Sequence, residues 1–220
     1  MSTLTLPCPA VLFDVDGTLV DSTALVERAA RQWAAEYGVD ADAYLDGVHG
    51  RRTADRVAEF LPPERVRAAA ERLEELEAAG ADGVTAVAGA RELLAGMGGL
   101  PWALVTSMGR DQLRDRTGAA GIPLPEVVVT ADDVDAGKPD PSGYRLAASR
   151  LGVDPRECVV VEDAPAGVRA GRAAGATVLA VTTGHAPSDL AEADLLVPDL
   201  TPVSAVPGGL RVSAHGMRRA

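Results

Sequence analysis

Five short, nearly continuous apolar segments constrain the fold of this chain more than any other feature. They are AVLFD (10–14), WALVT (102–106), EVVVT (126–130), CVVVE (158–162) and TVLAV (177–181). Apolar runs of this length without alternation are typical of strands that are buried on both faces of a sheet. Helical patterns follow several of them, over 110–120, 142–151 and 166–174. The alternation of strand and helix predicts an α/β fold, a doubly wound parallel sheet with helices on both faces.

One long segment between the first two strands breaks this alternation. Residues 22–80 have the pattern of consecutive helices, with Ser22 as a candidate N-cap, and therefore predict a helical insertion. The outgoing and returning crossings of such an insertion lie side by side, which would form a hinge for a cap that closes over the sheet. We expect a core of residues 1–19 and 84–203, a helical cap of residues 20–83, and a flexible C-terminal tail of residues 204–220.

Charge and composition limit the partners of the chain. With 32 acidic and 21 basic residues, the net charge of −11 repels nucleic acid. No apolar run approaches the roughly 18 residues needed to span a membrane, and the N-terminus lacks the basic segment of a signal peptide. The two cysteines fit no metal-binding spacing and are expected to be reduced thiols. We therefore expect a cytoplasmic monomer that binds neither nucleic acid nor membranes.

Polar side chains capable of chemistry follow the predicted strands. Because ligands bind at the carboxyl ends of parallel strands, these residues should meet at one edge. They are Asp14 and Asp16, Thr106 and Ser107, Lys138, and Glu162 and Asp163. Four carboxylates at one edge repel one another, and a divalent cation would offset that repulsion. Ligands that are all oxygen atoms favour Mg²⁺, which also accepts a phosphate oxygen of a substrate.

Lys138 is the only lysine of the chain, whose other 20 basic residues are arginines. Chance explains this composition as well as a requirement for a compact ammonium group does. Each polar pair, taken singly, is equally consistent with a turn or a helix cap. The recurrence of the same chemistry at every strand that lines the predicted crevice favours a functional site.

Four segments of the chain resemble the signatures of the haloacid dehalogenase-like superfamily of phosphatases, in the order of that family. The first is Asp14-Val15-Asp16-Gly17-Thr18, and the second is Thr106-Ser107. The third is Gly137-Lys138-Pro139-Asp140-Pro141, and the fourth is Val161-Glu162-Asp163-Ala164-Pro165-Ala166-Gly167. The helical insertion resembles the first type of cap in that family. The match is most similar to sugar-phosphate and glycerol-phosphate phosphatases and to β-phosphoglucomutase-like proteins.

This resemblance implies a Rossmann-like core and a role for each strand-end residue. Asp14 would attack phosphorus and become an aspartyl phosphate, while Asp16 would act as general acid and base. Thr106 would hydrogen-bond the transferring phosphoryl group, and Lys138 would balance its charge. Asp14, the backbone carbonyl of Asp16, Glu162 and Asp163 would hold Mg²⁺. The implied reaction is hydrolysis of a phosphate ester of a small sugar or polyol.

Choice among substrates would come from the cap and its margins, because the core residues are committed to the phosphoryl group and Mg²⁺. The candidate substrate-binding residues are Ser107, Asp21, His49, Arg51 and Arg52. A solvated surface position is the alternative for both cap arginines. The low aromatic content of 3% argues against a pocket that stacks a nucleotide base.

Three other functions share part of this pattern. A β-phosphoglucomutase-like phosphomutase remains the alternative within the same family. A receiver-like phospho-acceptor domain also clusters Asp, Thr and Lys around Mg²⁺, but its acidic pair comes first and it has no helical insertion. A nucleotide-binding loop at Gly137-Lys138 fails because Pro139 replaces the required Ser or Thr.

Overall fold

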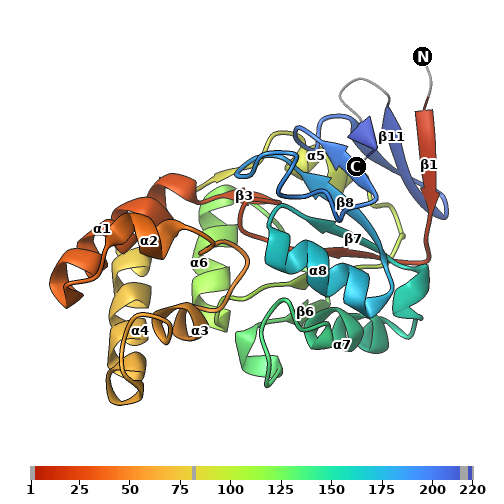
Figure 1. Ribbon diagram of the computed structural model, residues 1–220. Coiled ribbons are helices and arrows are strands. Elements are labelled where there is room, and N and C mark those ends of the chain that lie inside the picture. Colours follow the sequence, from red (N-terminus) through yellow and green to blue (C-terminus); the bar gives the residue numbers. More distant parts are fainter. Residues whose placement is uncertain (1–2, 81–82, 214–217, 220) are drawn as a thin grey trace.

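The computed structural model describes residues 3–80, 83–213 and 218–219, and it has an α/β core with a helical cap at one side (Figure 1). The main sheet has the strand order β12-β9-β8-β7-β2-β5-β6, and all of its neighbours pair in parallel except β12 with β9. This sheet confirms the predicted doubly wound α/β class. Its strands are β2 (Val11–Phe13), β5 (Trp102–Val105), β6 (Val127–Val129), β7 (Val159–Glu162), β8 (Thr177–Val181), β9 (Leu195–Val197) and β12 (Arg218–Arg219).

Helices cover both faces of this sheet because alternate strand residues point to opposite faces. Phe13 of β2 belongs to an apolar cluster that includes residues of α5 and α6, whereas its neighbour Leu12 belongs to a second cluster with residues of α7 and α8. The core helices are α5 (Ala90–Ala95), α6 (Arg110–Ala120), α7 (Ser142–Leu151) and α8 (Pro165–Ala174), with short 3₁₀ helices η2 (Ala131–Asp133) and η3 (Pro155–Glu157).

The cap is built from α1 (Thr23–Tyr37), α2 (Ala41–Leu45), α3 (Thr53–Val57) and α4 (Pro63–Ala78). It has an apolar core of its own, centred on the fully buried Trp33. The Trp33 ring stacks on Tyr37 with 5.2 Å between centroids, and its Nε1 donates to the carbonyl of Ala69 at 2.8 Å. The two crossings between core and cap pair as antiparallel strands β3 (Val20–Asp21) and β4 (Thr85–Ala86). The connection between core and cap is therefore a two-stranded ribbon, and its action as a hinge stays a prediction.

Residues 204–213 correct the expectation of a flexible C-terminal tail, whereas residues 214–217 and 220 of that tail lie outside the described residues. β10 (Val203–Val206) and β11 (Gly209–Ser213) form a hairpin, and β11 also pairs with β1 (Thr3–Pro7), giving the order β1-β11-β10. Leu210 and Val212 are fully buried and alternate with the polar residues that follow each of them. This pattern of period two, next to a Pro-Gly-Gly turn, is typical of a hairpin strand, and a search for helical periodicity does not detect it. Within the described ranges, none of the helices has the length and apolar character needed to cross a membrane.

Candidate active site

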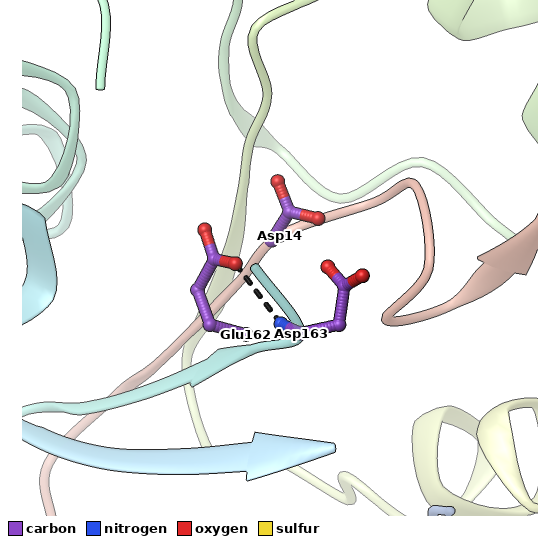
Figure 2. Close-up of side chains that lie close together, drawn as sticks. All are labelled: Asp14, Glu162 and Asp163. Carbon is purple, nitrogen blue, oxygen red and sulfur yellow. Dashed lines mark hydrogen bonds between the residues drawn. The ribbon is translucent and has the colours of Figure 1, made fainter. Parts of the chain in front are cut away.

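Three carboxylates meet at the carboxyl ends of the neighbouring strands β2 and β7. The backbone N–H of Asp14 donates to the carbonyl of Val161 at 2.9 Å, which fixes Asp14 beside Glu162 and Asp163. One oxygen from each of the three carboxylates lies within 4.8 Å of the others, and all three residues are buried (Figure 2). The parallel register thus brings together residues nearly 150 positions apart in the sequence, as expected of strand ends at one edge.

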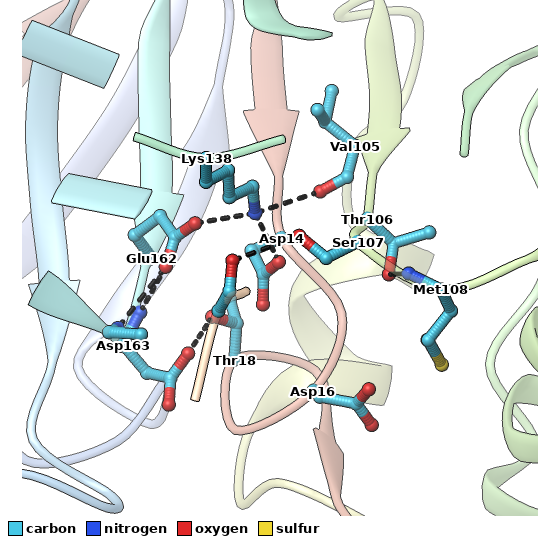
Figure 3. A network of polar contacts seen from close by, with 12 residues as sticks. Asp14, Asp16, Thr18, Val105, Thr106, Ser107, Met108, Lys138, Glu162 and Asp163 are labelled. Atoms are coloured by element: carbon cyan, nitrogen blue, oxygen red, sulfur yellow. Dashed lines mark hydrogen bonds and ion pairs between the residues drawn. The ribbon is translucent and has the colours of Figure 1, made fainter. Parts of the chain in front are cut away.

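The lone lysine of the chain is placed against this cluster. Lys138 Nζ lies 2.5 Å from Asp14 Oδ1 and 2.6 Å from Glu162 Oε1, and it donates to the carbonyl of Val105 at 3.2 Å (Figure 3). Its side chain is buried, and the two carboxylates raise its pKa although burial alone would lower it. Lys138 therefore stays protonated and partly neutralises the carboxylates.

Two residues that were not predicted as site residues, Tyr144 and Gly167, surround Glu162. The buried Tyr144 hydroxyl donates to Glu162 Oε1 at 2.7 Å, while Oε2 accepts from the backbone of Asp163 and Ala164. A Cβ at Gly167 would lie 1.6 Å from Oε1, so only glycine leaves room for this carboxylate. Gly167 lies in the fourth signature segment, five residues after Glu162, whereas Tyr144 lies outside all four segments.

Burial and mutual repulsion dominate the electrostatics of the cluster. They raise the pKa of Asp14 from 3.8 to about 8, with burial as the main cause and the Glu162 charge as the second. Burial and the Asp14 charge likewise raise the pKa of Asp163 well above its usual value. A bound divalent cation would favour the ionised carboxylates, and a set of donors that are all oxygen atoms suits Mg²⁺. The residues therefore fit the implied metal.

The turn after β2 supports Asp163 from the other side. Thr18 Oγ1 donates to Asp163 Oδ1 at 3.3 Å. Gly17 has a φ of +81°, and a Cβ there would lie 2.0 Å from Asp163 Oδ2. The Asp-Gly-Thr sequence thus provides a left-handed turn and the space that the carboxylate occupies.

Thr106 and Ser107 follow β5 and line the same cavity as Asp14. Thr106 is buried, and its Oγ1 accepts a hydrogen bond from the backbone N–H of Met108 at 3.2 Å. Ser107 Oγ donates to the carbonyl of Gly50 in the cap at 2.9 Å. Ser107 is therefore a contact between core and cap as well as a candidate substrate-binding residue.

The Asp16 side chain points away from the carboxylate cluster (Figure 3). Its Oδ1 accepts from Ser22 Oγ at 2.7 Å, and its Oδ2 lies 2.6 Å from an Arg116 nitrogen. Ser22 occupies the N-cap position of α1, but its hydroxyl is bonded to Asp16 instead of to the helix. Arg116 also pairs with Glu77 of the cap, and sequence reasoning identified neither of these residues.

Three of the four predicted cap residues line a narrow cavity of about 70 Å³ that also contains Asp14 and Asp16. Arg52 donates to the carbonyls of Val134 and Asp135 in the core, at 2.6 and 3.0 Å. Arg51 pairs with Glu59 at 2.6 Å. Both guanidinium groups are thus engaged by protein acceptors, and substrate binding by Arg51 and Arg52 stays a prediction.

The other two predicted cap residues, His49 and Asp21, lie in different surroundings. The His49 ring packs edge-on against His185 of the core with 5.4 Å between centroids, and burial lowers its pKa. Asp21 is exposed in β3, accepts a hydrogen bond from the backbone N–H of Thr23, and lies outside the residues that line the cavity. Asp21 therefore lies apart from the other cap residues, because the strand alternation of β3 turns it outward, and its membership of the substrate-binding group stays a prediction.

Comparisons with known proteins agree with this geometry. Residues 8–175 match the haloacid dehalogenase-like hydrolase family. Hexitol phosphatase A of Escherichia coli (strain K12) is 44% identical over 205 residues, which cover 90% of this chain and 94% of that protein. Glycerol-1-phosphate phosphohydrolase 2 of Saccharomyces cerevisiae is 35% identical over 192 residues, covering 82% of this chain and 77% of that protein.

Solved structures show the same likeness. CbbY from Rhodobacter sphaeroides, in a complex with xylulose-(1,5)bisphosphate, has a TM-score of 0.80 and 26% identity over 91% of this chain and 98% of that one. A putative β-phosphoglucomutase from Bacteroides vulgatus has a TM-score of 0.75 and 31% identity over 89% of this chain and 86% of that one.

The chain belongs to the haloacid dehalogenase-like hydrolase family. Within that class it is an enzyme that hydrolyses phosphoric monoesters.

Proposed function

We propose that this enzyme is a Mg²⁺-dependent phosphatase of small phosphorylated sugars or polyols that reacts through an aspartyl phosphate on Asp14. The observation that carries the proposal is the placement of Asp14, which is buried beside Glu162 and Asp163 and is paired with the protonated Lys138. A carboxylate held in this way can act as a nucleophile, and the neighbouring charges are arranged for a phosphoryl group.

In the first step a carboxylate oxygen of Asp14 attacks phosphorus, and the bond from phosphorus to the leaving oxygen breaks. Asp16 donates a proton to that oxygen, so that the sugar or polyol leaves as a neutral alcohol. In the second step Asp16 accepts a proton from water, the water oxygen attacks phosphorus, and the bond to Asp14 breaks to release inorganic phosphate. Lys138 and Thr106 stabilise the charge on the phosphoryl oxygens during both steps.

Mg²⁺, when bound, would stabilise the negative charge shared by Asp14 and the phosphoryl oxygens. Asp14, Asp163 and the backbone carbonyl of Asp16 would hold it. Glu162, whose oxygens already accept hydrogen bonds from Lys138, Tyr144 and two backbone N–H groups, would contribute negative charge beside them.

The substrate class rests on the cavity and on the relatives. The cavity is small. Among the described residues that line it, Tyr44 is the one Phe, Tyr or Trp side chain, and it offers little surface for base stacking. Relatives named for hexitol, 2-deoxyglucose-6-phosphate and glycerol-1-phosphate hydrolysis support a small hydroxylated leaving group.

The test is a panel of phosphate esters assayed with Mg²⁺, comparing hexitol, glycerol and sugar phosphates with nucleotides. We expect the highest kcat/KM for a small polyol or sugar phosphate, and we expect Asp14→Asn to abolish turnover while the protein stays folded. Mass spectrometry of the acid-quenched wild-type enzyme should find a phosphoryl group on the peptide that contains Asp14. A nucleotide as best substrate, or substantial turnover by pure Asp14→Asn enzyme, would refute the proposal.

The same panel separates hydrolysis from the alternative reaction. A phosphomutase would convert one sugar phosphate isomer into another in the presence of a sugar bisphosphate, whereas a phosphatase releases inorganic phosphate. The likeness to a putative β-phosphoglucomutase is the reason to test for this second reaction as well.

A further inference from the structure

We propose that Arg116 is a positioning residue that sets the orientation of Asp16 and, through Glu77, makes that orientation depend on the seating of the cap. The inference rests on the general acid and base role of Asp16 in the proposed function. It concerns residues of α6 and α4 that carry no part of the family signatures identified in the sequence.

Arg116 lies between the core and the cap with almost no exposure. Its side chain is 3% exposed, one guanidinium nitrogen lies 2.6 Å from Asp16 Oδ2, and the other lies 2.6 Å from Glu77 Oε2. Gln112, one turn earlier on α6, also donates to Glu77 Oε2. Helices α4 and α6 run side by side at this contact (Figure 1). The three cavity-lining residues thus form a chain of polar contacts that ends on Asp16.

Arg116 contacts two carboxylates at once, and this makes the arrangement specific. Burial would lower the pKa of Arg116, but the charges of Asp16 and Glu77 raise it, so the guanidinium stays protonated. Its planar fork can donate to both carboxylates at once, whereas a lysine ammonium at the same place would reach both less well. Since Ser22 donates to the other oxygen of Asp16, the carboxyl plane is held from two sides.

The two carboxylates that Arg116 contacts belong to different parts of the molecule. Asp16 and Arg116 are core residues, whereas Glu77 lies near the end of cap helix α4. A cap that swings away on the β3–β4 ribbon takes Glu77 with it and removes one of the two carboxylates that fix Arg116. The acid and base group is then held fully only when the cap is seated, which limits transfer of the phosphoryl group to water in the open enzyme.

The consequence is measurable as a dependence on the leaving group. Formation of the aspartyl phosphate from an alkyl ester, such as glycerol 1-phosphate, needs a proton from Asp16. The same step from p-nitrophenyl phosphate does not, because p-nitrophenolate leaves without protonation. Damage to the positioning of Asp16 should therefore slow the first reaction and spare the second.

The experiment measures single-turnover rates of aspartyl phosphate formation from both esters. The variants are Arg116→Met, Arg116→Lys, Glu77→Gln and Asp16→Asn, with Arg72→Lys as a matched control in α4 that lies in an ion pair with Glu36. We expect Arg116→Met to slow the alkyl ester about 100-fold and the aryl ester less than threefold. Arg116→Lys should recover part of the loss, and Glu77→Gln should show the same selectivity at about tenfold. Arg72→Lys should match the wild type.

The outcomes separate the inference from the proposed function. If Asp16→Asn slows both esters equally, the role of Asp16 is wrong. If Asp16→Asn slows only the alkyl ester while Arg116→Met and Glu77→Gln slow both esters equally, Arg116 has a merely structural role and the inference is overturned. Thermal unfolding of each variant shows whether it is folded. Glu77→Gln preserves the side-chain volume and decides the question if Arg116→Met does not fold.

Discussion

Replacing the proposed nucleophile should make the metal-free protein more stable. Asp14 is 3% exposed, and its pKa rises from 3.8 to about 8, with burial as the main cause and the Glu162 charge as the second. The ionised carboxylate is therefore costly in the folded state without a cation. Asparagine has nearly the same shape and no proton to lose, so Asp14→Asn avoids this cost.

The sign and size follow from the two pKa values. As the pH rises, the unfolded chain releases the Asp14 proton near 3.8 and the folded chain only near 8. The stability of the wild type is thus fully present below the lower value and falls across this interval. At 1.36 kcal/mol per pH unit, the loss reaches about 4 kcal/mol at pH 7, which is the upper limit of the expected stabilisation by Asp14→Asn.

The assay is urea unfolding followed by far-ultraviolet circular dichroism at about pH 4, 7 and 9, with a chelator or with Mg²⁺. We expect Asp14→Asn to exceed the wild type by about 1 to 4 kcal/mol at pH 7 in chelator, with the two converging near pH 4. Mg²⁺ should narrow the difference, because it binds the folded wild type. The control Asp111→Asn, at a side chain that is 97% exposed, should leave stability unchanged.

A wild type as stable as Asp14→Asn at about pH 9 in chelator would refute this reasoning. A difference that stays constant across the pH range would refute it equally, since titration of Asp14 would then not be its cause.

Three further predictions concern activity. Lys138→Met should lower kcat about 10² to 10³-fold, and Lys138→Arg should lower it nearly as much, because a longer planar group does not fit between Asp14 and Glu162; a near wild-type rate for Lys138→Arg would restore chance as the reason for the lone lysine. Chelation should abolish phosphate release and Mg²⁺ should restore it, with Ca²⁺ a poor substitute because of its looser coordination; full activity in excess chelator would contradict this. Arg52→Ala should raise KM about tenfold for alkyl and aryl esters alike, since its hydrogen bonds join the cap to the core, whereas Arg51→Ala should change KM less; a loss confined to sugar phosphates would instead make Arg52 a substrate contact.

Local patterns in the sequence predicted most of the α/β core. The five apolar runs contain β2, β5, β6, β7 and β8, and the helical patterns match α6, α7 and α8 closely. Strands that are buried on both faces are recognisable in the sequence as continuous apolar runs. The carboxyl ends of parallel strands necessarily lie at one edge of the sheet. The meeting of Asp14, Lys138, Glu162 and Asp163 could therefore be predicted from the sequence.

Contacts between distant segments had no such local signal. Arginine is the usual cation of this chain, so neither Arg116 between Asp16 and Glu77 nor Arg52 on the carbonyls of Val134 and Asp135 stands out in the sequence.

The outward turn of Asp21 and the pairing of β11 with β1 also depend on the tertiary structure. The sequence by itself determined which residues end each strand, because a continuous apolar run is a local feature. Which side chains share a partner was decided only by the tertiary structure, in which α4 packs against α6 and the cap segment between α2 and α3 packs against the core. Those contacts depend on the relative placement of whole elements.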